Sequence, residues 1–239
     1  MEAFAEKATG DMNGPLVSII IPTCNRAAYL TAALESVLAQ DYAAKEIIVV
    51  DDGSTDETAE VCARFPVVYL RQENRGPSAA RNLGVSRCQG GLLAFPDDDD
   101  LCPPGSLRVR VEHWRRDADC HHLVGTVRRF SGEAAEPIQF IDSEEQARNF
   151  ICLGAEVMMR SAFEEAGGFD EALRMGEDVD LWGRMREAGL TRKFIPEITL
   201  YYRRHPGNST HDPQVAQHGI LKTLRASIQR KRQGGRVAS

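Results

Sequence analysis

Hydrophobic and polar residues alternate in blocks along the first hundred residues, and the blocks have the lengths of buried strands and amphipathic helices. Four apolar, mostly β-branched runs predict buried strands at 17–21, 47–50, 67–70 and 92–95. Apolar positions from Tyr29 to Leu38 recur at helical spacing, Thr55 or Asp56 can cap a second helix, and Pro77 opens a third. This order predicts an α/β fold with a doubly wound, open twisted and mostly parallel sheet.

The second half of the chain has a less regular pattern. Helices are expected at 103–116, 163–169 and 178–188, and strands at 123–130 and 192–202. The segment 133–149 is polar and only weakly periodic. No internal repeat or interdomain linker is found, so the pattern predicts a single domain.

Polar segments follow each of the four predicted strands of the first half. These segments are 23–26, 51–54, 73–75 and 97–100. Ligands of such sheets bind outside the carboxyl ends of the strands, so we expect all four segments around one cleft. A further acidic cluster occurs at 176–180. Because isolated buried charges are costly, these acids need water, a cation or a polar ligand, which suggests a metal-assisted site for a phosphate-bearing substrate.

Composition narrows the class of protein. The chain has 239 residues, of which 42% are hydrophobic and 27% charged, as in ordinary globular proteins. A net charge of -6 argues against nucleic acid as a partner. No apolar run approaches the roughly 20 residues of a membrane-spanning helix. Six cysteines without a CxxC pair argue against a zinc site or a disulfide framework and favour a cytoplasmic protein with reduced thiols.

Five segments of the sequence resemble family 2 glycosyltransferases of the GT-A type. They are, in chain order, VSIIIPTCNRAAYLTAALESVLAQ, EIIVVDDGSTDET, ENRGPSAARNLGV, LLAFPDDDD and GGFDEALRMGEDVDLWGRMREAG. The resemblance covers roughly residues 16–211. It implies a Rossmann-like GT-A domain that transfers a sugar with inversion, using Mn²⁺ or Mg²⁺ and a nucleotide-sugar donor, with a UDP-sugar favoured. The implied acceptor is a saccharide or lipid-linked hydroxyl, in the synthesis of a polysaccharide, glycolipid or cell-envelope glycan.

The resemblance also assigns residues to the donor. Thr23, Arg26 and Asp52 correspond to the family's nucleotide-binding corner, where a carboxylate can accept the N–H of a uracil-like base. Arg81 corresponds to an arginine that approaches the nucleotide. For Asp52 a plain Asp-Gly-Ser turn is the alternative explanation.

The acidic run at 97–100 resembles the family's Asp-x-Asp motif. It implies Asp99 as the direct metal ligand, with Asp97 and Asp98 in donor binding. The register stays open, since Asp98-x-Asp100 has the same spacing. His205 resembles a residue near the C-terminal end of the family's domain. It is a candidate for a third metal ligand or a phosphate contact, and an ordinary surface-loop histidine is the alternative.

Glu177 and Asp178 resemble the acidic pair that supplies the catalytic base. Asp178 is implied to take the proton from the acceptor hydroxyl, with Glu177 beside it. Acidic residues also suit a helix N-terminus, an explanation that is compatible with catalysis. Trp182, four residues after Asp178, can stack on a sugar or be buried.

The expected organisation is a mobile leader at 1–14, a glycosyltransferase domain at 15–212 and a basic tail at 213–239. Residues 15–101 would bind the nucleotide sugar, and 102–212 would bind the acceptor and carry the base. The tail can lie on the inner face of an anionic membrane or be a solvated terminus.

Three alternative functions fit the sequence less well than a glycosyltransferase. A nucleotide-sugar-binding module without catalytic activity would not need a base such as Asp178. A sugar nucleotidyltransferase would need a glycine-rich loop after the first strand, and a glycosidase would have no use for a nucleotide-binding corner.

Overall fold

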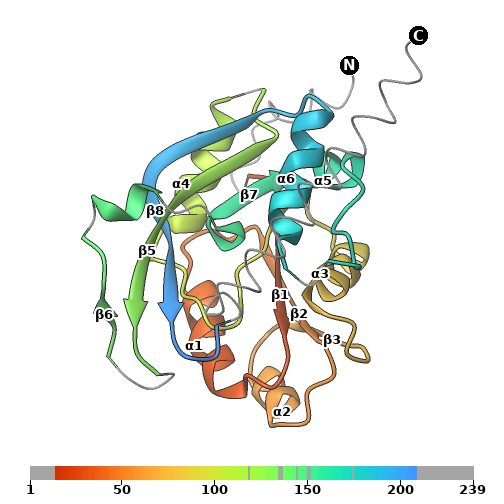
Figure 1. Ribbon diagram of the computed structural model, residues 1–239, viewed down its shortest axis with the longest axis vertical. Coiled ribbons are helices and arrows are strands. Elements are labelled where there is room, and N and C mark those ends of the chain that lie inside the picture. The colour runs from red at the N-terminus through yellow and green to blue at the C-terminus, as the bar shows by residue number, and fades with distance from the viewer. Residues whose placement is uncertain are drawn as a thin grey trace.

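A mixed β-sheet forms the centre of the molecule, and helices cover both of its faces (Figure 1). The computed structural model describes residues 14–117, 119–133, 137–143, 145–149, 152–173 and 175–208. Within these residues eight strands form one sheet in the order β3-β2-β1-β4-β7-β5-β6, with β8 paired to β5. The predicted α/β class with an open, mostly parallel sheet in a single domain is confirmed.

The first half of the chain builds the parallel part of the sheet. β1 (Val17–Thr23) lies between β2 (Lys45–Asp51) and β4 (Leu92–Ala94), and β3 (Val68–Arg71) follows β2; all three pairings are parallel. All seven residues of β1 are buried because both faces of the sheet are covered, which explains its continuous apolar run.

Two apolar cores lie on opposite faces of this sheet. Ile19 and Ile21 of β1 pack on one side with α1 (Ala27–Leu38), α2 (Thr58–Cys62) and α4 (Ser106–Arg115). Ile20 packs on the other side with α3 (Pro77–Arg87), α5 (Arg160–Glu165) and α6 (Glu177–Glu187). The alternation of side chains along β1 therefore places the helices in two layers, as a doubly wound sheet requires.

Within the described residues, the second half of the chain adds four strands to the sheet, mostly in antiparallel pairs. β7 (Glu156–Met159) is antiparallel to both β4 and β5 (His122–Ser131), and thereby joins the two halves of the sheet. β8 (Arg192–Arg204) is parallel to β5, and β6 (Gln139–Phe140) pairs with the end of β5. Two short 3₁₀ turns, η2 (Gln146–Asn149) and η3 (Leu153–Ala155), precede β7.

Some elements differ from the sequence prediction. β7 was not predicted, because four residues with one acid and two methionines carry no strand signal of their own. α5 begins at Arg160 and ends at Glu165, before the two glycines that were expected to stop it. α2 begins later than predicted, at Thr58, and Asp56 accepts hydrogen bonds from the backbone N–H groups of both Thr58 and Ala27, at 3.2 and 3.0 Å. Asp56 therefore helps to fix the start of α1 as well.

Apart from Gly14, the predicted leader at 1–14 and the predicted basic tail at 213–239 lie outside the described residues. None of the described helices combines the length and apolar character that crossing a bilayer would require.

Candidate active site

The ends of β1 and β2 are tied together by a small polar network. The backbone N–H of Asn25 donates to Ser54 Oγ at 2.9 Å, and Asn25 Oδ1 accepts from the backbone N–H of Thr55 at 2.7 Å. Gly53, with φ +84°, allows the chain to turn here, and a Cβ at this position would lie 3.0 Å from the backbone nitrogen of Asn74. The loops after the first three strands are thus held close together.

Asp52 organises the loop that leads into α3. Its Oδ1 accepts from Gln72 Nε2 at 2.7 Å and from the backbone N–H of Arg75 at 2.8 Å, and its Oδ2 accepts from the backbone N–H of Gly76 at 2.8 Å. The carboxylate is almost fully buried, with 4% exposure, yet the residue lines the large cavity described below. Asp52 therefore lies at the cavity in which a nucleotide base was predicted to bind. Part of its capacity to accept hydrogen bonds is already used by groups of the protein.

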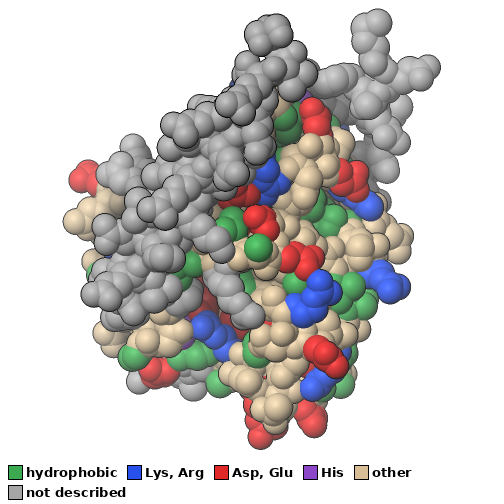
Figure 2. Space-filling model, turned by 45° about the vertical axis from the view of Figure 1, so that its right-hand side comes forward, with side chains coloured by type: hydrophobic (Ala, Val, Ile, Leu, Met, Phe, Trp, Pro, Cys, Tyr) green, Lys and Arg blue, Asp and Glu red, His purple; other side chains and the backbone are tan. Residues whose placement is uncertain are grey.

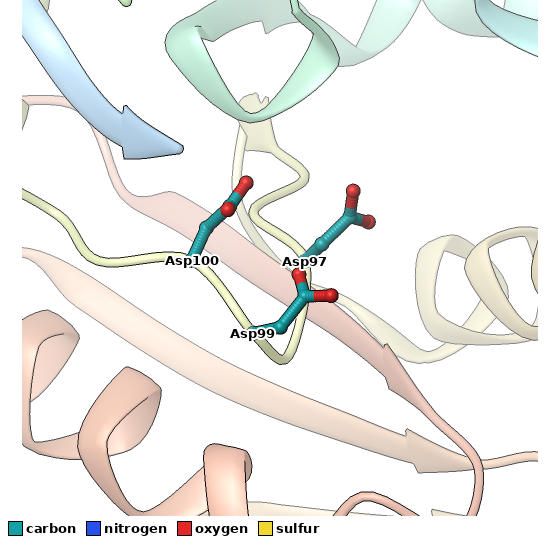
Figure 3. A group of neighbouring side chains, drawn as sticks. All are labelled: Asp97, Asp99 and Asp100. Atoms are coloured by element: carbon teal, nitrogen blue, oxygen red, sulfur yellow. The ribbon is translucent and has the colours of Figure 1, made fainter. Parts of the chain in front are cut away.

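Three carboxylates of the loop after β4 converge (Figure 3). One oxygen each from Asp97, Asp99 and Asp100 lies within 4.8 Å of the others. Asp100 Oδ1 accepts from the backbone N–H of Arg203 at 2.9 Å, whereas Asp100 Oδ2 is buried and has no hydrogen-bond partner among the described residues. Hard divalent cations such as Mg²⁺ and Mn²⁺ bind carboxylate oxygens, and a bound cation would satisfy this buried oxygen. These residues fit a divalent metal site.

Asp98 is not part of this converging group, and it is buried. Burial, together with the negative charge of Asp99, raises the pKa of Asp98 to about 8. Arg26 Nη1 lies 3.6 Å from Asp98 Oδ1 and donates a short hydrogen bond to Asp99 Oδ2. His205 Nε2 lies 3.0 Å from the same Asp99 oxygen, and its ring stacks on Tyr29 with centroids 4.6 Å apart. Both predicted residues, Arg26 and His205, therefore contact the acidic cluster.

Arg81 connects the acidic cluster to α6. It is 4% exposed, and its guanidinium donates to Asp97 Oδ1 at 2.6 Å and to Glu177 Oε1 at 2.9 Å. Burial alone would lower the pKa of Arg81, but the charges of Asp97 and Glu177 outweigh burial and raise it, so the side chain is cationic. Arg81 neutralises two carboxylates that would otherwise repel each other.

Asp178 lies in the first turn of α6, which begins after Gly176. Its Oδ1 accepts from the backbone N–H of Val179 at 2.7 Å. Burial, together with the adjacent charge of Glu177, raises the pKa of Asp178 to about 6. A carboxylate with this pKa can accept a proton near neutral pH, so the helix-terminal position and the predicted role as a base are compatible.

One cavity of about 510 Å³ brings most of these residues together. Its lining includes Thr23, Arg26, Asp52, Arg81, Asp97, Asp98, Asp99, Glu177 and Asp178. Every site residue predicted from the sequence, except His205, thus lines one cavity, and His205 contacts it through Asp99. On the face drawn in Figure 2, the described acidic and basic side chains are interspersed and form no continuous basic area of the kind that nucleic-acid binders use.

The sequence analysis missed a wall of this cavity and the network behind it. Cys152 and Leu153 line the cavity just before β7. Glu156 Oε2 accepts from Trp182 Nε1 at 3.0 Å and lies 2.6 Å from His122 Nε2. The indole N–H of Trp182 is therefore held by a buried carboxylate. No motif in the sequence indicated these contacts, because they depend on the antiparallel placement of β7.

Comparison with known protein sequences identifies glycosyltransferases as relatives of this chain. The family model described as "Glycosyl transferase family 2" matches residues 18–161. An "Uncharacterized glycosyltransferase" of Rickettsia prowazekii is 30% identical over 212 residues, which cover 82% of this chain and 66% of that protein. The chondroitin synthase of Escherichia coli is 28% identical over 227 residues, which cover 90% of this chain and 33% of the synthase. The chain thus spans two thirds or less of the length of these two relatives.

Solved structures share the fold. A mannosyltransferase from Pyrobaculum calidifontis, in complex with GDP-Man and Mn²⁺, superposes with a TM-score of 0.73 at 17% identity, covering 95% of this chain and 70% of that chain. Staphylococcus aureus TarS in complex with UDP-GlcNAc gives a TM-score of 0.67 at 20% identity, covering 81% and 60% of the two chains. Both have the architecture described above.

Proposed function

Because the chain belongs to glycosyl transferase family 2, we propose that it transfers a sugar from a nucleotide-sugar donor to an acceptor hydroxyl, with a divalent cation and with inversion at the anomeric carbon. The observation that carries this proposal is that one cavity is lined both by carboxylates of the converging acidic loop and by Asp178, whose pKa is raised to about 6. A cation site for a diphosphate and a poised base are the two parts that such a transfer needs.

The donor would lie along the ends of β1, β2 and β4. We assign the nucleotide to Thr23, Arg26 and Asp52, and the diphosphate to the side of Arg81 and the acidic loop. A UDP-sugar is the favoured donor on the family resemblance. Related folds have been solved with UDP-GlcNAc and with GDP-Man, so both nucleotides belong in the test.

The acidic loop would hold Mn²⁺ or Mg²⁺ through Asp97, Asp99 and Asp100, with His205 beside Asp99. When bound, this ion supplies positive charge to the nucleoside diphosphate as it leaves. Arg26 donates to one oxygen of Asp99 and so neutralises part of the loop, and we assign it a contact with a donor phosphate as well.

The transfer itself would use one carboxylate. Ionised Asp178 takes the proton of the acceptor hydroxyl while the hydroxyl oxygen forms a bond to the anomeric carbon and the bond to the diphosphate oxygen breaks. Glu177 accepts a hydrogen bond from Arg81, which leaves Asp178 as the base of the pair. A single displacement without a protein nucleophile inverts the anomeric configuration. The acceptor would be a saccharide or lipid-linked hydroxyl used in glycan synthesis.

Calorimetric titration with UDP and GDP, each with and without Mn²⁺, tests the donor site. We expect one nucleotide to bind more tightly with Mn²⁺ than without, and the Asp99→Ala variant to lose this metal dependence. Asp178→Asn should keep the nucleotide affinity and lose transfer. Absence of binding of both nucleotides in the presence of Mn²⁺ would refute the donor site, and an unchanged metal effect in Asp99→Ala would refute the assignment of Asp99.

A further inference from the structure

A second cavity, of about 340 Å³, lies beyond His205. It is lined by Arg129, Ile141, Arg204, His205 and Pro206. It shares none of its lining residues with the larger cavity. None of the five lining side chains is acidic, and two are arginines.

The strand register places the two cavities on the same face of the sheet. In the parallel pair β5–β8, Arg129 is opposite Tyr202, and Ser131 is opposite Arg204. Side chains alternate along a strand and directly opposed residues share a face, so Arg129, Tyr202 and Arg204 point to the same side. Tyr202 lines the larger cavity. The second cavity therefore extends the same face toward the carboxyl ends of β5 and β8.

The two arginines of this cavity differ in their contacts. Arg129 Nε and Nη2 donate to the two carboxylate oxygens of Asp142, each at 2.7 Å, so the charge of Arg129 is compensated. Arg204 is half-buried and has no hydrogen bond or ion pair with any residue that the structure describes. A guanidinium partly withdrawn from water is stabilised best by a carboxylate or phosphate group, which it binds through two parallel N–H groups.

The two neighbouring arginines on the opposite face of the strands, Arg203 and Arg128, both have partners among the described residues, unlike Arg204. Arg203 donates to the backbone carbonyls of Asp99, Gly132 and Glu133, at 2.8, 3.0 and 3.1 Å. Arg128 stacks over the ring of Phe140 at 3.7 Å. Of the four arginines in the two adjacent pairs, Arg204 is thus the one whose charge no described residue compensates.

We propose that this second cavity binds an anionic group, a phosphate or a carboxylate, that belongs to the acceptor. Arg204 provides the main contact, and Arg129 adds a second guanidinium whose orientation Asp142 fixes. This inference rests on the proposed function and specifies the class of its acceptor. The donor diphosphate is a poorer occupant, because it must reach the acidic loop, and His205 stands between that loop and the cavity with Nε2 on Asp99.

The test uses the full chain saturated with Mg²⁺ and whichever of UDP or GDP it binds, so that the donor site is filled. Methyl phosphate and, separately, acetate are titrated in, and binding is followed by ¹H–¹⁵N NMR, which also locates the site. We expect saturable shifts near residues 129 and 204, and at least a tenfold weaker affinity in Arg204→Ala. The preferred probe identifies the anion as phosphate or carboxylate.

Control measurements separate a specific role of Arg204 from the loss of any surface arginine and from an effect on nucleotide binding. Arg64→Ala removes an exposed arginine that has no polar partner among the described residues, and it should leave probe binding unchanged. Arg204→Ala should bind the nucleotide as the native protein does, within twofold. No probe binding to the loaded native protein, equal binding in Arg204→Ala, or loss of nucleotide affinity in that variant would each overturn the proposal. If neither nucleotide binds, the proposed function fails, whereas the same titration of nucleotide-free protein still tests this cavity.

Discussion

Replacing Asp178 by asparagine should make the protein more stable while it abolishes transfer. The native carboxylate has a pKa of about 6, compared with an ordinary value of 3.8. The folded state therefore holds this proton more tightly than the unfolded chain does. Between pH 3.8 and 6 the stability falls as the pH rises, and above pH 6 the full penalty of an ionised, half-buried Asp178 is present.

The size of the effect follows from the shift. At about 1.4 kcal/mol per pKa unit, the difference between 3.8 and about 6 corresponds to roughly 3 kcal/mol at pH 8 and about half of that at pH 5. Asparagine has nearly the same shape and no charge, so it removes this penalty. Its amide oxygen can keep the hydrogen bond from the Val179 N–H, and the effect of that bond on the ionised carboxylate is already contained in the pKa shift. We therefore expect a gain of roughly 3 kcal/mol at pH 8 that falls to about half of that at pH 5.

Urea unfolding at pH 5 and pH 8, without metal or nucleotide and followed by tryptophan fluorescence, measures this difference. Glu73→Gln is the matched control, because Glu73 is exposed and has no polar side-chain contact among the described residues; it should show no such pH-dependent gain. A loss of stability in Asp178→Asn at pH 8, or a gain that is equal at both pH values, would refute the assigned environment of Asp178.

Three further predictions follow from the same structure. The kcat/KM of the native enzyme should fall below pH about 6 as Asp178 becomes protonated, and a pH–rate profile that stays level down to pH 4.5 would contradict its role as the base. Arg81→Met should destabilise the protein by about 3 kcal/mol, because it leaves two carboxylates without their shared cation; thermal unfolding with no change would contradict this. Gly53→Ala should cost at least about 1 kcal/mol from its positive φ and the close backbone nitrogen of Asn74, whereas Gly91→Ala, with open space around it, should stay within about 0.5 kcal/mol when both are measured by chemical unfolding.

The sequence was most informative where local pattern and burial agree. The parallel strands of the first half are buried on both faces, so their apolar runs are visible without any tertiary information. The rule that ligands bind at the carboxyl ends of such strands then brought Thr23, Asp52 and Asp97 into one cleft, and all three line the same cavity.

The sequence was least informative where a contact depends on long-range pairing. β7 has no strand signal and is held between β4 and β5, so Glu156 and its hydrogen bond to Trp182 were not foreseen. The four consecutive aspartates could not be separated by spacing alone. The folded loop separates them, since carboxylate oxygens of Asp97, Asp99 and Asp100 converge, while Asp98 does not belong to this group. The free charge of Arg204 is equally invisible in a sequence that has arginine pairs at both 128–129 and 203–204.

The pairing of β8 with β5 also sets the order in which the acidic loop can acquire its partners as the chain folds. The contacts of Arg203 and His205 with Asp99 and Asp100 span 103 to 106 residues. The polar ties between the β1 and β2 loops span only 29 or 30. Closing a long loop is slower and entropically more demanding, so the β1 and β2 loops can come together early, whereas the acidic loop gains Arg203 and His205 only when β8, the last described strand, docks. Among the described contacts, those that complete the proposed metal site therefore form late, and Mg²⁺ in a refolding buffer would act on this late step.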